Sequence, residues 1–250
     1  MPSAKRMSFF PYIHSLSESN VSVKPGEFNH IAKNSKYMIN LYQVIEMDIR
    51  GGIYMRLILA SNSKTRKDIF DMIGWEYEVV TSNVEENSLS IEPKQYVIDL
   101  SRNKANSVAS QLNDKALIVA ADSIIYMDNK KFEKPKDKKE GYENIKKMSG
   151  KINYAITGVT IKDLYSNKEI SFTDTTEVYF KKVTDEDILW YVENEKYLLN
   201  RAGYSIAGKT SIFIDKIVGD YYNILGMPIS KLYSKLNELG YSISDFKMKD

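Results

Sequence analysis

The sequence ALIVAADS, at Ala116–Ser123, holds the most hydrophobic strand pattern of the chain. Its run of apolar residues predicts a strand buried on both faces, as strands are when helices cover both sides of a sheet. Asp122 directly follows this run. A carboxylate there is costly unless it is hydrogen-bonded, binds a metal or opens onto a cleft, and ligands of open α/β sheets bind at such strand ends. Asp122 is therefore a candidate functional residue, with a turn-forming Asp as the alternative.

Helix and strand patterns alternate on both sides of this run. Pro93 suits the first turn of a long helix, and Asp128-Asn129 suits a hairpin turn. Strands are predicted at 56–60, 77–81, 116–121, 124–126, 131–132, 154–165, 169–180 and 211–218, and helices at 64–73, 93–112, 137–148, 184–199 and 228–239. This order predicts an α/β domain with a mixed central sheet flanked by helices.

Charge and periodicity divide the 250 residues into two parts. Residues 1–54 show no sustained periodicity and hold 6 Lys and Arg against 4 Asp and Glu, whereas residues 55–250 hold 29 of each. We expect residues 1–54 to be an irregular N-terminal extension or an artefactual start ahead of Met55, and residues 55–250 to form one domain. Because that domain is neutral, we expect no nucleic acid partner.

The composition excludes several kinds of chemistry. Cys is absent, which excludes disulfides and Cys nucleophiles and fits a reducing compartment, so we expect a cytoplasmic protein. The only His residues are His14 and His30, so residues 55–250 contain no Ser-His-Asp triad and no His-bound zinc. Carboxylates, Lys, Arg and hydroxyls remain, and these groups serve phosphoryl chemistry around a hard cation such as Mg²⁺. No apolar run is long enough for a transmembrane helix, and we expect no membrane partner.

The segment GYSIAGKT, at Gly203–Thr210, matches the P-loop pattern GxxxxGK[ST] letter for letter. A P-loop needs a strand before the loop and a helix after it, because the helix N-terminus faces the phosphates. Here a helix pattern precedes the loop and the alternating sequence SIFIDKIV follows it. We interpret the segment as a Gly-rich turn. The alternatives are a P-loop NTPase, and a loop that lines a substrate pocket without being a P-loop.

Further candidates lie at the ends of the other predicted elements. Ser61 and Ser63 precede the first helix, where backbone N–H groups and hydroxyls bind anions, and Arg66 lies one turn inside. Simple helix capping by Ser63 is the alternative. Glu85-Glu86 follows the second strand and can hold a cation or form a solvated acidic loop. Lys104 is predicted in mid-helix and Lys134 in a charged segment, and neither is distinctive by itself.

The order of these segments resembles the Maf (septum-formation protein) family. LASNSKTR at Leu59–Arg66 is similar to the family's opening LASxSxRR. The resemblance covers roughly residues 56–239 and leaves out residues 1–54. The further similar segments, in family order and spacing, are SNVEE (Ser82–Glu86), LSRNKA (Leu100–Ala105), VAADS (Val119–Ser123), EKP (Glu133–Pro135), MSG (Met148–Gly150), ITGV (Ile156–Val159), TEV (Thr176–Val178), AGYSIAG (Ala202–Gly208) and GDYYNILGMPIS (Gly219–Ser230).

The resemblance implies a two-lobed α/β fold with a cleft between the lobes. It implies a nucleoside triphosphate pyrophosphatase that uses Mg²⁺ or Mn²⁺, often as a homodimer, and releases monophosphate and pyrophosphate from dTTP, UTP or modified nucleotides. By resemblance, Ser61, Ser63 and Arg66 bind the substrate. The catalytic residues would be Asp122, Glu86, Lys104 and Lys134, of which Asp122 and Glu86 would also hold the metal.

Four positions depart from the family pattern. Thr65 replaces the first Arg of an Arg pair, Glu133 replaces a Gly, Asn153 replaces a His, and Ala207 replaces a Gln. Thr65 and Ala207 remove side chains that would contact the ligand, so a catalytically weakened nucleotide-binding protein is a further alternative. That alternative predicts nucleotide binding without turnover, whereas a P-loop enzyme would release or transfer the γ-phosphate.

Overall fold

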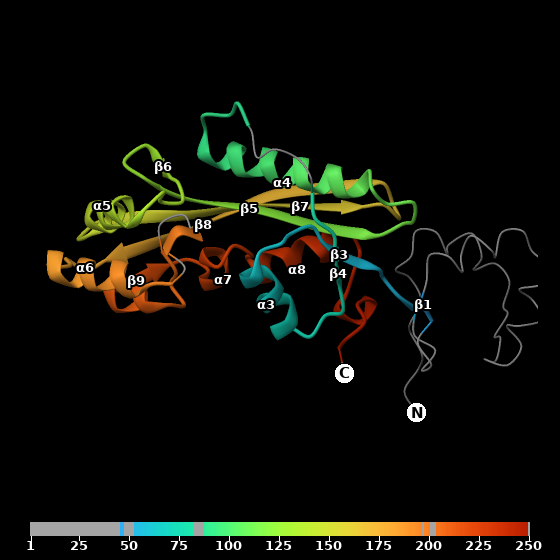
Figure 1. Cartoon of the computed structure of the whole chain (residues 1–250). Coiled ribbons are helices and arrows are strands. Elements are labelled where there is room, and N and C mark those ends of the chain that lie inside the picture. The colour runs from blue at the N-terminus through green and yellow to red at the C-terminus, as the bar shows by residue number, and fades with distance from the viewer. Residues whose placement is uncertain (1–45, 48–52, 83–87, 197, 201–203, 250) are drawn as a thin grey trace, which may run out of the picture.

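The computed structural model describes residues 46–47, 53–82, 88–196, 198–200 and 204–249 (Figure 1). Within this part, seven strands form one mixed sheet in the order β4-β3-β5-β7-β8-β9, with β6 paired to β5. β3 runs parallel to β4 and β5, and the other pairs are antiparallel. The strands are β3 (Leu57–Leu59), β4 (Glu78–Val79), β5 (Leu117–Met127), β6 (Lys130–Phe132), β7 (Ile152–Asp163), β8 (Lys168–Phe180) and β9 (Ile214–Val218). The predicted mixed α/β sheet is confirmed.

Helices cover both faces of this sheet. α4 lies across one face, and α3, α7 and α8 lie on the other (Figure 1). α5 and α6 pack against each other at one end of the sheet (Figure 1). The helices are α3 (Lys64–Met72), α4 (Pro93–Ala109), α5 (Lys138–Met148), α6 (Asp185–Asn194), α7 (Tyr221–Ile224) and α8 (Ile229–Glu238), with short 3₁₀ turns η2 (Leu198–Asn200), η3 (Lys209–Phe213) and η4 (Ile243–Asp245).

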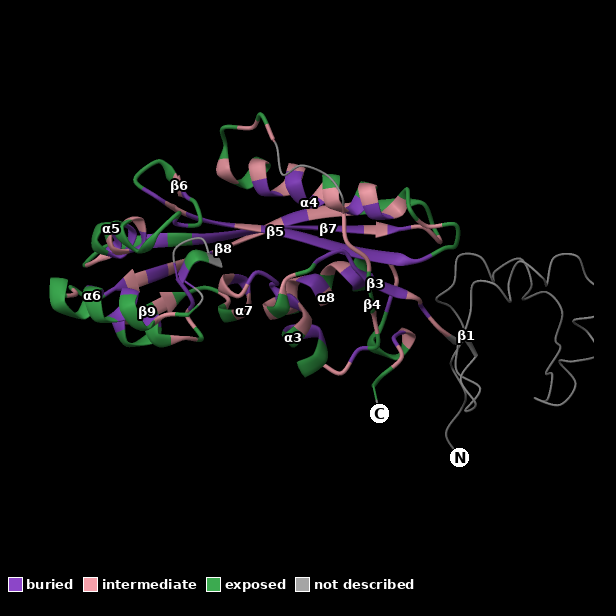
Figure 2. Cartoon of the chain, viewed as in Figure 1, coloured by how far each residue is buried: buried purple, intermediate pink, exposed green. Residues whose placement is uncertain are grey.

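The alternation of side chains along β5 explains why this strand is buried on both faces. Ile118 and Ala120 pack with residues of α4, whereas Leu117, Val119 and Ala121 pack with residues of α3 and α8. Figure 2 shows that most of β5 is buried. Burial of apolar surface on both sides is the main driving force for this three-layer arrangement.

The position predicted for Asp122 at the end of its strand is wrong. β5 continues to Met127, and Asp122 pairs with Gly158 in the middle of the β5–β7 ladder. The strand continues because its antiparallel neighbour β7 is equally long and satisfies its backbone groups. A Cβ atom at Gly158 would lie 2.5 Å from the backbone of Val97, so the close approach of α4 to the sheet requires glycine there.

The strand neighbours of β5 change at Asp122. Along the edge of β5 that faces away from β7, β3 pairs with residues 117–119 of β5 and β6 pairs with residues 125–127. Among the described residues, no strand pairs with residues 120–124 of β5 along this edge. Separate hydrophobic clusters lie beside the two ends of β5, one around Phe70 and Leu232 and one around Ile145 and Tyr191. These clusters correspond to the two predicted lobes, and the gap between β3 and β6 separates them.

Two predicted hairpin turns have the backbone that their sequences require. Asp128 and Asn129 have φ values of 52° and 59°, and Asn167 has a φ of 56°. Asn and Asp tolerate this left-handed region better than other residues with side chains, and such turns match the twist of the flanking strands. The β5–β6 turn returns the chain to the gap beside Asp122.

The segment expected to be irregular contains a short ladder. β1 (Glu46–Met47) pairs antiparallel with β2 (Ile53–Tyr54). This pairing provides hydrogen-bond partners for backbone N–H and C=O groups just before the domain begins. The Met55 N–H then donates to the Asp245 carbonyl at 2.8 Å. The rest of residues 1–54 lies outside the described residues. In the part of the chain that the structure covers, no helix has the length and apolar character to cross a membrane.

Candidate active site

A cavity of 960 Å³ opens at the gap between β3 and β6. It gathers residues from the loop after β3, from α3, from α4, from the middle of β5 and from the β5–β6 hairpin. Its walls include Ser61, Ser63, Arg66, Lys104, Asp122 and Lys134, which are the predicted site residues that the structure describes. Glu85 and the seventh predicted residue, Glu86, lie outside the described residues.

Arg66 is buried at the inner wall of this cavity, with 9% of its surface exposed. Its Nε donates to the Gly226 carbonyl at 2.8 Å, Nη1 to Ser61 Oγ at 3.2 Å and Nη2 to Ser123 Oγ at 3.0 Å. Gly226 has a φ of 92°, and a Cβ atom there would lie 3.1 Å from Ser123 Oγ. The guanidinium is thus fixed by three elements, which limits the conformations in which it meets an anion.

Ser63 is the N-cap residue of α3, but its side chain makes no capping hydrogen bond. Its backbone N–H donates to Ser61 Oγ at 3.2 Å. Simple capping therefore does not account for the Ser63 hydroxyl, which lines the cavity. The N-terminus of a helix of this length presents N–H groups that favour an anion.

Lys104 and Asp122 form an ion pair in the centre of the cavity wall. Lys104 Nζ donates to Asp122 Oδ1 at 2.5 Å, and about a tenth of each side chain is exposed. Asp122 lies on the face of β5 that α4 covers, so the helix delivers Lys104 directly to the carboxylate. Sequence reasoning treated these residues as separate contacts, whereas the structure couples them in one pair. A buried pair that opens onto a cavity holds its carboxylate in one orientation.

The β5–β6 hairpin adds charged residues that the sequence prediction did not assign. Lys131 donates to the Tyr96 hydroxyl and forms an ion pair with Glu133, both at 2.8 Å. Lys131, Glu133 and Lys134 line the cavity, and Lys134 is solvent-exposed. Sequence reasoning missed Lys131 because it lies in a charged, unremarkable segment. The predicted hairpin turn could have revealed it, because that turn folds the segment back over Asp122.

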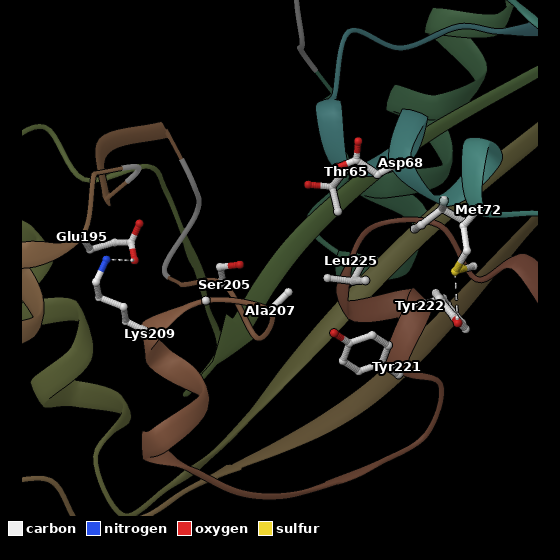
Figure 3. Close-up of a pocket in the computed structure, with 12 residues that line it drawn as sticks. Thr65, Asp68, Met72, Glu195, Ser205, Ala207, Lys209, Tyr221, Tyr222 and Leu225 are labelled. Carbon is white, nitrogen blue, oxygen red and sulfur yellow. Dashed lines mark hydrogen bonds and ion pairs between the residues drawn. The ribbon is translucent and has the colours of Figure 1, made fainter.

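Two smaller cavities adjoin the first one at Thr65. One, of 200 Å³, has a mixed lining, in which Ile124, Ile206 and Leu225 lie beside polar residues such as Ser205. The other, of 570 Å³, lies between α3, α7 and residues 205–209 (Figure 3). In Figure 3, Thr65 and Ala207 lie on different sides of this space, with Leu225 between them and Tyr221 below. The two departures from the family pattern that concern ligand contact therefore meet at one cavity.

Asn153, the third departure, has a structural role in the described contacts. It is fully buried and accepts a hydrogen bond from the Tyr204 hydroxyl at 2.8 Å. Burial raises the pKa of the Tyr204 phenol well above its ordinary value. Tyr204 lines the 200 Å³ cavity, so Asn153 fixes one of its walls.

The P-loop-like segment lacks the surroundings of a P-loop in its described residues, 204–210. Lys209 begins the five-residue 3₁₀ helix η3, which leads directly into β9. η2 and α6 precede the segment. Lys209 Nζ lies 4.0 Å from Glu195 Oε2 (Figure 3). The segment lines the 570 Å³ cavity through Ser205, Ala207, Gly208 and Lys209, as the pocket-lining alternative predicts.

The described residues contain no group of three or more His, Cys, Asp or Glu side chains that could hold a metal ion. Asp122 is the predicted ligand within this part, and it lines the 960 Å³ cavity. Mg²⁺ is commonly held by one or two carboxylates together with substrate phosphates and water. Asp122, in a cavity suited to phosphates, fits that mode of binding.

Comparison with known proteins identifies the family. The Maf-like protein family model matches residues 56–239. A dTTP/UTP pyrophosphatase from Thermoanaerobacter sp. (strain X514) is 38% identical over 182 residues, which cover 73% of this chain and 95% of that protein. A dTTP/UTP pyrophosphatase from Carboxydothermus hydrogenoformans is 35% identical over 187 residues, which cover 75% and 100%.

A HAM1 protein from Coxiella burnetii aligns with a TM-score of 0.39 at 12% identity, over 74% of this chain and 99% of that one, and adds nothing to the assignment. The family model spans most of residues 55–250, and both relatives are matched over nearly their full length. The chain therefore belongs to the family of Maf-like proteins.

Proposed function

We propose that this protein is a nucleoside triphosphate pyrophosphatase that hydrolyses the bond between the α- and β-phosphates and acts on dTTP and UTP. The observation that carries the proposal is the convergence of Ser61, Ser63, Arg66, Lys104, Asp122 and Lys134, from five segments of the chain, on one cavity. The substrates are those of the two relatives, each of which is a dTTP/UTP pyrophosphatase. Family membership and the chemistry of the cavity support the same activity.

Two of the adjoining cavities suggest an orientation for the substrate. Cationic side chains line the 960 Å³ cavity and suit the triphosphate. The 200 Å³ cavity joins it at Ser63, Arg66 and Ser123 and is lined by both apolar and polar side chains, which suit the ring and the polar edge of a nucleobase. The nucleoside would therefore point toward Leu225 and the triphosphate toward the β5–β6 hairpin.

A divalent cation, Mg²⁺ or Mn²⁺, belongs to the proposal. Asp122 would hold it together with phosphate oxygens of the substrate, and the second predicted ligand, Glu86, lies outside the described residues. When bound, such an ion polarises a phosphate oxygen and neutralises charge on the polyphosphate.

The residues of the chain perform the remaining tasks. Asp122 orients a water molecule and accepts its proton while the water oxygen bonds to the α-phosphorus and the bond to the β-phosphate oxygen breaks. The products are the monophosphate and pyrophosphate. Lys104 holds the Asp122 carboxylate through their 2.5 Å contact, and Arg66 and Lys134 stabilise charge on the phosphates.

The proposal also covers the setting of the enzyme. Residues 55–250 would form the pyrophosphatase domain and residues 1–54 an extension outside it. The enzyme would act in the cytoplasm, without nucleic acid or membrane as a partner, and as a homodimer. The neutral charge of residues 55–250 supports the exclusion of nucleic acid.

Product analysis tests the proposed activity. Purified protein is incubated with dTTP, UTP and the other common NTPs, with Mg²⁺ and separately with Mn²⁺, and the products are separated by chromatography. The proposal predicts monophosphate and pyrophosphate, with dTTP and UTP as the preferred substrates. Diphosphate and phosphate would contradict it. Nucleotide binding without product would favour the weakened nucleotide-binding protein, which the position of Thr65 and Ala207 at one cavity supports.

A further inference from the structure

Lys131 is not among the residues predicted to contact phosphate. It nevertheless lines the 960 Å³ cavity proposed to hold the triphosphate. It belongs to β6, where Lys130 is exposed, Phe132 is buried, and Lys131 between them is half-buried. Lys131 pairs across the ladder with Tyr126, and its side chain crosses the gap to α4. The hairpin thus delivers this charge to a defined position.

Three groups hold the Lys131 ammonium. Its Nζ lies 2.8 Å from the Tyr96 hydroxyl, 4.2 Å from the centre of the Tyr96 ring and 2.8 Å from Glu133 Oε1. Burial alone would lower the pKa of Lys131, but the hydrogen bonds to Glu133 and Tyr96 outweigh burial and raise the pKa above its ordinary value. Lys131 therefore carries a full positive charge near neutral pH.

The ion pair between Lys131 and Glu133 can be replaced by another anion, whereas the contact between Lys131 and Tyr96 is held in place by α4. The Glu133 side chain is 69% exposed, and exposed ion pairs contribute little to stability. Tyr96 belongs to the first turns of α4 and packs beside the cluster of Val97, Ile124 and Ile156. A phosphate with a larger charge can therefore displace the carboxylate while the phenol keeps the ammonium in place.

The position of Lys131 suits the far end of a triphosphate. Tyr96 and Lys104 are eight residues apart on α4, which corresponds to about 12 Å along the helix. Lys131, held at Tyr96, and Lys104, held at Asp122, therefore meet the cavity at positions that are separated along α4, as an elongated polyanion requires. Lys131 lines the 960 Å³ cavity and is not part of the lining of the 200 Å³ cavity, which is the proposed nucleobase end.

We infer that Lys131 binds the terminal phosphate of a nucleoside triphosphate, exchanging the Glu133 carboxylate for phosphate oxygens, and thereby makes the site select triphosphates over diphosphates. Tyr96 acts as a positioning residue for the ammonium. This inference rests on the proposed function, because it takes the cavity as the triphosphate site. Glu133, which replaces a family Gly, competes with the substrate for Lys131 and weakens triphosphate binding.

Binding of two non-hydrolysable analogues tests the inference without relying on turnover. The dissociation constants of α,β-methylene-UTP and α,β-methylene-UDP are measured by calorimetry in Mg²⁺ for the wild type and for Lys131→Met. The wild type should bind the triphosphate analogue more tightly. Lys131→Met should weaken triphosphate binding by about 10–100-fold, the range for a charged hydrogen bond, and leave diphosphate binding nearly unchanged.

Three matched variants sharpen the result. Lys131→Arg should restore most of the selectivity, and Lys130→Met, which removes the exposed charge next to it, should behave like the wild type. Glu133→Gln should tighten triphosphate binding about two- to fivefold, because an exposed competing ion pair is removed. A thermal melt checks that each variant is folded.

Equal weakening of both analogues, or no effect of Lys131→Met on either, would overturn the inference. A wild type that binds both analogues equally would overturn it as well. The products formed from UTP by the wild type are read separately. If they are diphosphate and phosphate, the proposed function fails, whereas pyrophosphate release with no change in the analogue ratio means that only the role of Lys131 fails.

Discussion

Two regions of the molecule carry residues suited to phosphate, and they differ in what the backbone does around them. In the cavity beside Asp122, the loop after β3 leads into α3, and Arg66, Lys104 and Lys134 reach one space from separate elements. In the region of residues 204–210, Lys209 opens a 3₁₀ turn that runs into β9, and its ammonium group lies near Glu195. The sequence of the first region matches no single phosphate-binding motif, whereas the second region matches the P-loop motif at every position.

The difference lies in the order of strand, loop and helix. A phosphate is held by N–H groups at the start of a helix that follows a strand, so an identical set of letters between a helix and a strand cannot build the same cradle. β3, the following loop and α3 have the required order at Ser61 and Ser63. The comparison predicts that substitutions in the cavity beside Asp122 reduce turnover strongly and that substitution of Lys209 does not.

The largest effect is expected for Asp122→Asn. The amide keeps the shape of the side chain but cannot accept the proton of the attacking water, so kcat should fall by roughly 10²–10⁴-fold. Steady-state kinetics with UTP measure the change, and circular dichroism checks the fold. Asp128→Asn is the control, because it removes an exposed carboxylate from the same hairpin at a turn position that suits Asn. Near-normal turnover in Asp122→Asn would remove Asp122 from its proposed role.

A smaller effect is expected for Arg66→Met. The substitution removes the donor for the Gly226 carbonyl, Ser61 and Ser123 in a buried position, and unsatisfied buried groups cost about 1–3 kcal/mol of unfolding free energy. Loss of a charged hydrogen bond to phosphate should also weaken UTP binding by about 10–100-fold. Denaturant unfolding and KM for UTP measure the two effects.

Lys67→Met provides the matched control for Arg66, because it removes a positive charge from the same helix outside the cavity. Its unfolding free energy and its KM should stay close to the wild-type values. If Arg66→Met changed stability and left KM unchanged, Arg66 would be a structural residue and not a substrate contact.

The sequence permits prediction of the sheet and the hairpins, because these follow from periodicity, turn residues and the order of elements, whereas Lys104 and Lys134 become site candidates only through the family resemblance. Asn129 and Asn167 fix their turns through local backbone preference. The buried character of β5 follows from its apolar run. In each case the signal is local, so a single sequence contains it.

Three features could not be predicted in this way, because each depends on a distant partner. Asp122 lies within β5 because β7 extends the ladder past it. The Lys104–Asp122 pair depends on how closely α4 approaches Gly158. Lys131 joins the cavity through Tyr96, which is 35 residues away in the chain. Turn and strand patterns carry no information about the first two contacts, and for Lys131 the predicted turn indicates the return toward Asp122 but not the contact with Tyr96.

The smallest effect is expected for Lys209→Ala, and this variant separates the two regions most directly. If the chemistry takes place beside Asp122, the variant should keep kcat/KM for UTP within about threefold of the wild type, as expected for loss of a weak, partly exposed ion pair. It should still release pyrophosphate. Abolished activity, or a wild type that releases phosphate from the γ-position, would contradict the account and assign catalysis to the 203–210 segment.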